Sequence, residues 1–263
     1  MSAVQSVVPS HDAQVRYVLR LADACLIHAQ RLSEWCGHAP ILEEDIALTN
    51  MALDLLGQSR ALLTHAGQLS GRTGGPALTE DQLAFLREER DYLNPTLVEL
   101  PRGDFAQAVL RNALVAIWLH LTWQRLATSS DAELVAVAAK AEKEARYHVQ
   151  HFGDWVIRLG DGTAESLRRM QAAVDGQWRY LAELFEDDVV DVQARERGWG
   201  PMASELQAPF DAAVGALMAE AGLAVPAASP FRSTGRRGVH SEHLGHLLTP
   251  MQHLQRSFPG GVW

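Results

Sequence analysis

Apolar residues recur at every third or fourth position along most of the chain, which is the pattern of amphipathic helices. The clearest case runs from Asp131 to Leu159, where one stripe alternates steps of four and three. The stripe consists of Leu134, Ala138, Ala141, Ala145, His148, Phe152, Trp155 and Leu159. A single histidine, His148, interrupts it. The pattern predicts a long helix with one buried face.

The same period predicts three more long helices, which Gly and Pro residues separate from one another. They run from His11 or Asp12 to Gly37, from about Glu43 to Gln68, and from about Asp104 to Ser129. The second is apolar nearly all round, which predicts a place in the middle of a bundle. In the crossover connection that follows it, Thr79 is expected to cap a short charged helix through Arg90.

A helical extension is expected after the fourth long helix, over about residues 163–256. An amphipathic segment reaches Phe185, and shorter helices are expected near Ser204 to Gly222 and Ser241 to Arg256. The acidic residues from Glu186 to Asp191 predict a solvated face or loop. The chain shows no internal repeat and no alternating strand pattern.

These elements predict an all-α protein. Four long helices joined by one long and two short connections are the plan of a ferritin-like bundle. We therefore expect one ferritin-like domain over residues 1–263, with the core bundle over about 12–159.

The composition of the chain excludes some classes of binding partner. A formal net charge of −9 and a pI near 5.6 argue against nucleic acid, because phosphate binding needs a positive surface. Residues 1–11 lack the basic start and apolar core of a signal peptide, and the longest wholly apolar run, Ala113 to Leu119, is too short to span a membrane. Cys25 and Cys36 are too far apart on one helix for a disulfide. These features predict a cytoplasmic protein that does not enter a membrane.

The histidine that interrupts the apolar stripe of the fourth helix is one half of a metal-binding motif. A di-iron site in a ferritin-like bundle needs a Glu from each of two helices and a Glu-x-x-His pair from each of the other two. In the fourth helix the positions of that pair hold Ala145 and His148. In the second helix the corresponding positions hold Asp54 and Gly57, so a shortened carboxylate remains and the histidine is missing.

The other two helices do not restore the ligand set. Residues 105–130 contain no Asp or Glu, so the third helix cannot supply its carboxylate. The first helix offers only Asp23 and Glu34, near its two ends. At least three of six expected ligands are missing, which predicts a degenerate site with no catalytic, metal-binding or cofactor-binding residues.

Without a metal, other groups must fill the centre of the bundle. We expect Asp54 and His148 to face each other there as a buried pair. An unpaired carboxylate would be costly inside the bundle, so a hydrogen bond to His148, direct or through one water, or an arginine partner is expected. Tyr17 is an alternative partner for His148. A different metal site could form if Glu144 or His151 met His148 on one helix face.

A second group of histidines lies near the C-terminus. His240, His243 and His246 are spaced three apart, which spreads them over about 120° of a helix surface. Surface or interface histidines are therefore expected rather than a metal cluster. No glycine-rich phosphate loop or nucleophile elbow is present, so neither a Rossmann site nor a hydrolase is indicated.

Four stretches make the chain similar to a known family. They are Gln30 to Pro40, Leu53 to Gln58, Lys143 to His148, and His240 to Gly245. Together they resemble the C subunits of bacterial phenylacetyl-CoA epoxidases, and the resemblance extends over almost the whole chain. It implies a ferritin-like, non-catalytic structural subunit of a cytoplasmic, multicomponent, NADPH-dependent monooxygenase. That complex places an epoxide across the aromatic ring of phenylacetyl-CoA during aerobic phenylacetate degradation.

The resemblance also implies a partner. In that family a homologous A subunit holds the di-iron centre and binds the substrate, so iron is expected in the partner and no cofactor in this chain. We expect an extensive interface with the A subunit, above about 2,000 Å² in total, and contacts with other subunits of the complex. Phe258 and Trp263 are candidate contributors to that interface. A homodimer in the absence of the partner remains an alternative.

Two other functions stay open from the residues alone. One is a metal-dependent oxidase with an unorthodox centre around Glu144, His148 and Asp54. The other is an accessory module that binds coenzyme A through loop arginines, because guanidinium groups suit phosphates. Those arginines are Arg232, Arg236 and Arg237.

Overall fold

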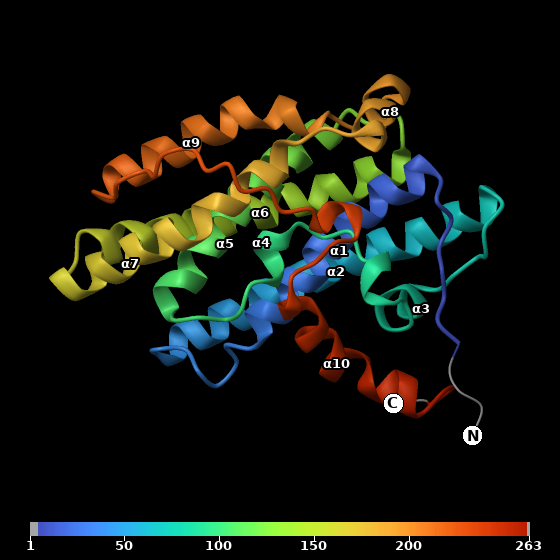
Figure 1. The fold of residues 1–263 in the computed structure, drawn as a ribbon, viewed down its shortest axis with the longest axis horizontal. Helices are drawn as coiled ribbons and strands as arrows, with labels where there is room; N and C mark the ends of the chain where they lie inside the picture. The colour runs from blue at the N-terminus through green and yellow to red at the C-terminus, as the bar shows by residue number, and fades with distance from the viewer. Residues whose placement is uncertain (1–4, 262–263) are drawn as a thin grey trace.

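Four long helices form the centre of the protein in the computed structural model, which describes residues 5–261. They are α1 (Ala13–Ser33), α2 (Leu42–Arg72), α5 (Phe105–Leu126) and α6 (Ala132–Gly160). Helix α1 packs against α2, α5 packs against α6, and α2 also contacts α6 (Figure 1). One long connection, residues 73–104, separates the two pairs. The expected all-α, ferritin-like bundle is confirmed, and residues 5–261 contain no strand.

Shorter helices complete the fold. The long connection contains α3 (Glu80–Phe85), the 3₁₀ segment η1 (Glu89–Asp91) and α4 (Thr96–Glu99). The remainder forms α7 (Ala164–Gln177), η2 (Trp178–Phe185), α8 (Val189–Arg197), η3 (Ala203–Leu206), α9 (Gln207–Glu220), η4 (Gly235–Arg237) and α10 (Glu242–Ser257). In Figure 1, α9 and α10 lie on opposite sides of the long helices. Trp263, a candidate interface residue, lies outside the described residues.

Aspartates begin three of the long helices, as their positions in the sequence indicate. The side chains of Asp12, Asp104 and Asp131 each accept hydrogen bonds from backbone N–H groups of the first helical turn. Such caps satisfy donors that have no partner inside the helix. Thr79 caps α3 in the same way. The first helix is shorter than expected and ends at Ser33 rather than Gly37.

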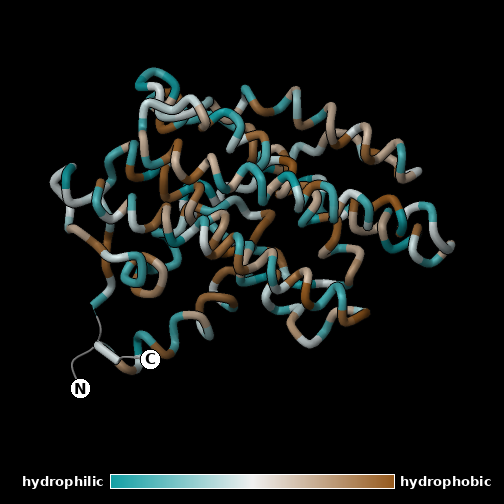
Figure 2. Tube along the Cα trace, turned by 180° about the vertical axis from the view of Figure 1, so that it is seen from behind, coloured by the Kyte–Doolittle hydropathy of each residue, from teal (hydrophilic) through white to brown (hydrophobic). Residues whose placement is uncertain are grey.

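The middle of the bundle is occupied by α1 and α5, and the expectation that α2 lies there is wrong. Buried residues make up 16 of the 21 in α1 and 16 of the 22 in α5, whereas α2 exposes Leu42, Ile46 and Leu53. The error arose because these surface residues are as apolar as core residues. Figure 2 shows apolar and polar residues alternating along the long helices.

Helix α5 is the one described helix that is long and apolar enough to cross a membrane by length and composition alone. Of its most apolar window, 78% is buried inside the protein. Its apolar surface is therefore already covered by the other helices.

The acidic segment Glu186 to Asp191 is not a solvated face, contrary to expectation. Asp191 is 1% exposed and accepts hydrogen bonds from Arg20 of α1 and from Arg236. Asp188 also pairs with Arg20. Burial alone would raise the pKa of Asp188, but the hydrogen bond and charge of Arg20 outweigh burial and lower it. The segment thus ties α8 to α1.

A second buried ion pair ties the long connection to α1. Asp23 and Arg87 both have fully buried side chains and form a bidentate pair. The same carboxylate accepts from the backbone N–H of Leu93 at 2.8 Å. Arg87 also donates to the carbonyl oxygens of Leu83 and Asp91. Every charged atom of this pair therefore has a partner, as burial requires.

His240 fixes the start of α10, and the expectation of a surface or interface histidine is wrong for this residue. It precedes the helix, and its side chain is fully buried. Its Nδ1 lies 2.8 Å from Glu99 Oε2, and its Nε2 lies 2.8 Å from the carbonyl oxygen of Tyr92. Both ring nitrogens face acceptors, an arrangement that favours the doubly protonated, charged ring. Burial would lower the pKa of His240, but Glu99 outweighs burial and raises it.

Removal of the Asp23 carboxylate should leave the buried guanidinium group of Arg87 without a counterion. We expect Asp23→Ala to lower the free energy of unfolding by about 3 to 5 kcal/mol, because Arg87 would keep its charge without a counterion. Chemical denaturation measures this. Glu165→Ala is the matched control, since Glu165 forms exposed ion pairs with Arg168 and Arg169. Equal melting temperatures for the two variants would contradict this role of Asp23.

The contribution of His240 should depend on pH with a defined sign. Because the pKa of His240 is raised on folding, its stabilisation is complete below the unfolded value of about 6.5 and is lost as pH rises through the folded value. The difference in unfolding free energy between the native protein and His240→Gln should shrink as the pH rises above about 6.5. The exposed His246 provides the control substitution, His246→Gln. A constant difference across this range would rule out the charged ring.

Candidate functional site

A small cavity marks the centre of the four-helix bundle. Each long helix contributes to it: His28 from α1, Leu55 from α2, Asn112 from α5 and His148 from α6. The other lining residues are apolar: Leu32, Val115, Ala116, Leu119 and Phe152. The space is about 10 Å³, close to the size of one water. A ferritin-like di-iron protein binds its metal at such a point, between inward-facing side chains of all four helices.

Two polar groups at this cavity, His28 and Asn112, carry no charge that could offset the charge of a metal ion. Burial, the charge of Arg111 and the neighbouring His148 lower the pKa of His28 to about 3, so the ring is neutral at physiological pH. Asn112 donates from Nδ2 to the carbonyl oxygen of Ala108. Among residues 5–261, His28 Nδ1 and Asn112 Oδ1 have no hydrogen-bond partner at ordinary distance, although Asn112 is close enough to His28 to raise its pKa slightly against the effect of burial. Sequence reasoning missed both residues because it searched the first and third helices for carboxylates only.

Asp54 and His148 meet as the sequence predicts. His148 Nε2 lies 3.1 Å from Asp54 Oδ2, and His148 is 4% exposed. The expectation of a fully buried pair is wrong, because the Asp54 side chain is 37% exposed. Asp54 lies on the outward side of α2, so its carboxylate reaches His148 from the surface. The other two degenerate positions differ: Gly57 is exposed and Ala145 is buried.

The contact between α2 and α6 is a row of polar pairs that includes this one. The pairs are Glu44 with His151 at 2.9 Å, Asp54 with His148 at 3.1 Å, Gln58 with Glu144 at 2.9 Å, and His65 with Asp131 at 2.7 Å. We call this row the α2–α6 seam. Glu144 also pairs with Lys140 at 3.2 Å. Glu144 and His151 therefore bond to partners other than His148.

The residues present do not fit a carboxylate-bridged iron centre. Such a centre needs four carboxylates around the metal, and none of the residues lining the central cavity is an Asp or Glu. His148, the remaining expected ligand, already bonds to Asp54. Across residues 5–261, no three or more His, Cys, Asp or Glu side chains gather closely enough to hold a metal ion.

The loop arginines are engaged by the protein itself. Arg232 pairs with Glu186 at 2.8 Å and donates to two backbone carbonyls of its own loop. Arg236 is 9% exposed and pairs with Asp191, and Arg237 lies 3.8 Å from Asp188. A phosphate would have to displace these carboxylates, so the structure offers no prepared coenzyme A site here.

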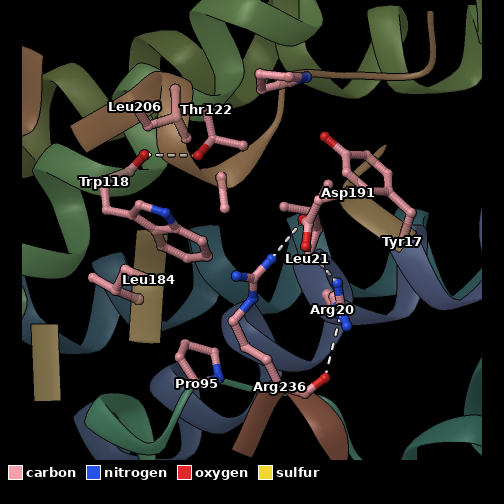
Figure 3. Close-up of a pocket in the computed structure, with 12 residues that line it drawn as sticks. Tyr17, Arg20, Leu21, Pro95, Trp118, Thr122, Leu184, Asp191, Leu206 and Arg236 are labelled. Atoms are coloured by element: carbon pink, nitrogen blue, oxygen red, sulfur yellow. Dashed lines mark hydrogen bonds and ion pairs between the residues drawn. The ribbon is translucent and has the colours of Figure 1, made fainter. Parts of the chain in front are cut away.

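A second cavity, of about 30 Å³, lies beside this arginine network. In Figure 3, Arg20 and Arg236 approach Asp191 from different elements, and Tyr17 and Trp118 form other parts of the wall. Burial raises the pKa of the Tyr17 hydroxyl, which stays protonated. The charged groups along this cavity are already paired with one another. Their ion pairs connect α1 to α8.

Loss of the Asp54 carboxylate should weaken the α2–α6 seam. Because Asp54 is about a third exposed, we expect Asp54→Ala to lower the free energy of unfolding by about 1 to 2 kcal/mol, less than a fully buried pair would lose. Asp54→Asn, which keeps an acceptor for His148, should lose less. Asp154→Ala removes an exposed carboxylate of the same helix pair and serves as the control. A melting temperature unchanged by Asp54→Ala would leave His148 as an ordinary packed side chain.

Comparison with known proteins agrees with this geometry. The family model described as "Phenylacetic acid catabolic protein" matches residues 3–263. A curated relative, the C subunit of 1,2-phenylacetyl-CoA epoxidase from Escherichia coli (strain K12), is 46% identical over 247 residues. That alignment covers 94% of this chain and 98% of the relative. The chain therefore belongs to the phenylacetic acid catabolic protein family.

Proposed function

We propose that this chain is the non-catalytic structural subunit of a phenylacetyl-CoA epoxidase. It pairs with the homologous di-iron A subunit and stabilises it in a cytoplasmic, NADPH-dependent monooxygenase of aerobic phenylacetate degradation. The observation that carries the proposal is the centre of the bundle, where His28, Asn112 and His148 stand among apolar residues and no carboxylate lines the cavity. The similarity to the C subunit of an epoxidase supplies the reaction in which the complex takes part.

The physical basis is the cost of a buried charge. A di-iron centre offsets the charge of its carboxylate ligands with the charge of its metal ions, and without metal those carboxylates would be unpaired in an apolar core. In this chain the bundle centre holds a neutral histidine and an amide instead. The protein is therefore suited to folding without a cofactor, while iron and substrate are bound by the A subunit.

No comparable observation supports either of the two alternative functions. An unorthodox oxidase needs Glu144, His148 and Asp54 at one point, but Glu144 bonds to Gln58 and Lys140. A coenzyme A module needs available loop arginines, and these pair with the acidic segment of residues 186–191.

The proposal predicts the metal content of the isolated chain. We expect protein purified without chelators from iron-supplemented cells to contain no stoichiometric iron and to show no epoxidation with any reductase, because the central cavity lacks carboxylate ligands. Elemental analysis and Mössbauer spectroscopy measure the iron, and turnover of phenylacetyl-CoA measures the activity. The A subunit, prepared in parallel, is the positive control for iron loading.

Two results would contradict the proposed function. One is a di-iron spectrum from this chain alone. The other is an A subunit that is equally soluble, iron-loaded and active with and without this chain.

A further inference from the structure

Two histidine rings border the small cavity at the centre of the bundle, His28 on α1 and His148 on α6. Both residues are buried, with 3% and 4% of their surfaces exposed. A neutral imidazole has one nitrogen that donates a hydrogen bond and one that accepts. Which nitrogen carries the hydrogen on each ring therefore decides what the cavity can bind.

The carboxylate of Asp54 fixes the hydrogen of His148. His148 Nε2 lies 3.1 Å from Asp54 Oδ2, and an ionised carboxylate accepts hydrogen bonds but does not donate them. Nε2 therefore carries the hydrogen, and Nδ1 of the neutral ring is an acceptor. Within residues 5–261, this bond to Asp54 is the only hydrogen bond of the His148 side chain. The Nδ1 acceptor thus receives no donor from the described chain.

Asn112 fixes the hydrogen of His28 in a similar way. Asn112 Nδ2 donates to the carbonyl oxygen of Ala108 at 2.7 Å, which leaves Asn112 Oδ1 as an acceptor. Burial lowers the pKa of His28 to about 3, so the ring is neutral, whereas Asn112 acts in the opposite direction, as an acceptor beside the ring does. In the described part of the chain, Asn112 Oδ1 and His28 Nδ1 have no other partner. These two atoms match each other, so His28 Nδ1 carries the hydrogen and Nε2 is a second acceptor.

The two remaining acceptors belong to rings that border a space for one water. The cavity measures about 10 Å³, at the lower limit for one water, and a buried water needs at least two polar partners. A water has two O–H groups, so it can donate one hydrogen bond to each ring. A chloride ion has no hydrogen to donate. A metal cation would bring a charge that no carboxylate of the cavity lining offsets.

We propose that one ordered water occupies the cavity and donates a hydrogen bond to His28 Nε2 and another to His148 Nδ1. The water lies where a ferritin-like di-iron protein binds its metal. It completes a continuous hydrogen-bond chain with one side chain from each long helix: Asp54 of α2, His148 of α6, His28 of α1 and Asn112 of α5. Each link joins one donor to one acceptor. The inference concerns the isolated chain and does not depend on the proposed pairing with an A subunit.

A high-resolution crystal structure of the full chain, purified without chelators, tests the identity of the ligand. We expect a single peak in the cavity, at about 2.7–3.2 Å from His28 Nε2 and from His148 Nδ1. An empty cavity would overturn the inference and leave the proposed function standing. A peak at about 2.0–2.1 Å from the two nitrogens would overturn both, because that distance is typical of a metal–imidazole bond.

Nitrogen-15 NMR spectroscopy of the histidine-labelled chain tests the hydrogen positions, because the two nitrogen shifts of an imidazole distinguish its tautomers. At about pH 8, above the ordinary imidazole pKa of about 6.5, we expect the hydrogen on Nε2 of His148 and on Nδ1 of His28. The variants His28→Leu and His148→Leu identify the two signals. The exposed His246 is the control, and its hydrogen should exchange between both nitrogens. A hydrogen on Nε2 of His28 or on Nδ1 of His148 would overturn the inference, since that ring would offer the water no acceptor.

A double-mutant cycle measures the coupling that the water provides between α1 and α6. Either His28→Leu or His148→Leu removes one of the two partners of the water, so their effects should not add. We expect the unfolding equilibrium constant of the double variant to rise about tenfold less than the two single effects predict together. The control pair, His28→Leu with the exposed His246→Leu, should be additive within about twofold. Circular dichroism checks that each variant is folded. Additive effects of His28→Leu and His148→Leu would contradict a water that bridges the two rings.

Discussion

A carboxylate can stay inside a helical bundle only where a cation or several hydrogen-bond donors meet it, and this constraint explains where the buried charges of the chain lie. Asp23 is met by Arg87, Asp191 by Arg20 and Arg236, and Glu99 by His240. All three carboxylates lie towards the connections and added helices. The residues that line the cavity at the bundle centre include neither a carboxylate nor an arginine or lysine.

The same constraint separates this bundle from a metal-binding relative of the same fold. In a di-iron protein the metal itself is the cation at the bundle axis, so the ligands and the metal stabilise one another. In this chain the α2–α6 seam connects the helices at that level through four hydrogen-bonded pairs. The bond between Asp54 and His148 joins two residues at the positions where the sequence analysis placed the expected metal ligands.

Helix positions and caps could be predicted from the sequence because both depend on neighbouring residues. The caps at Asp12, Asp104 and Asp131 involve backbone groups only two or three residues away. The contact between Asp54 and His148 was also predictable, since the helix register of a ferritin-like bundle brings these positions together. His28 and Asn112 escaped notice because the expected ligands were carboxylates.

The failures of prediction involve contacts between residues that are distant in the sequence. The acidic segment looked solvated because Arg20, which pairs with Asp188, is 168 residues away. Helix α2 looked central because Leu42, Ile46 and Leu53 are apolar, although they lie on the surface of this chain. Local patterns distinguish apolar from polar faces but do not show which apolar faces the rest of the chain covers.

The most direct test of a bundle that folds without metal is a crystal structure of the complex with the A subunit, with data collected at the iron absorption edge. We expect anomalous peaks for iron in the A subunit and no peak in the cavity lined by His28, Asn112 and His148. An iron peak in that cavity would contradict the central claim that this bundle folds without metal.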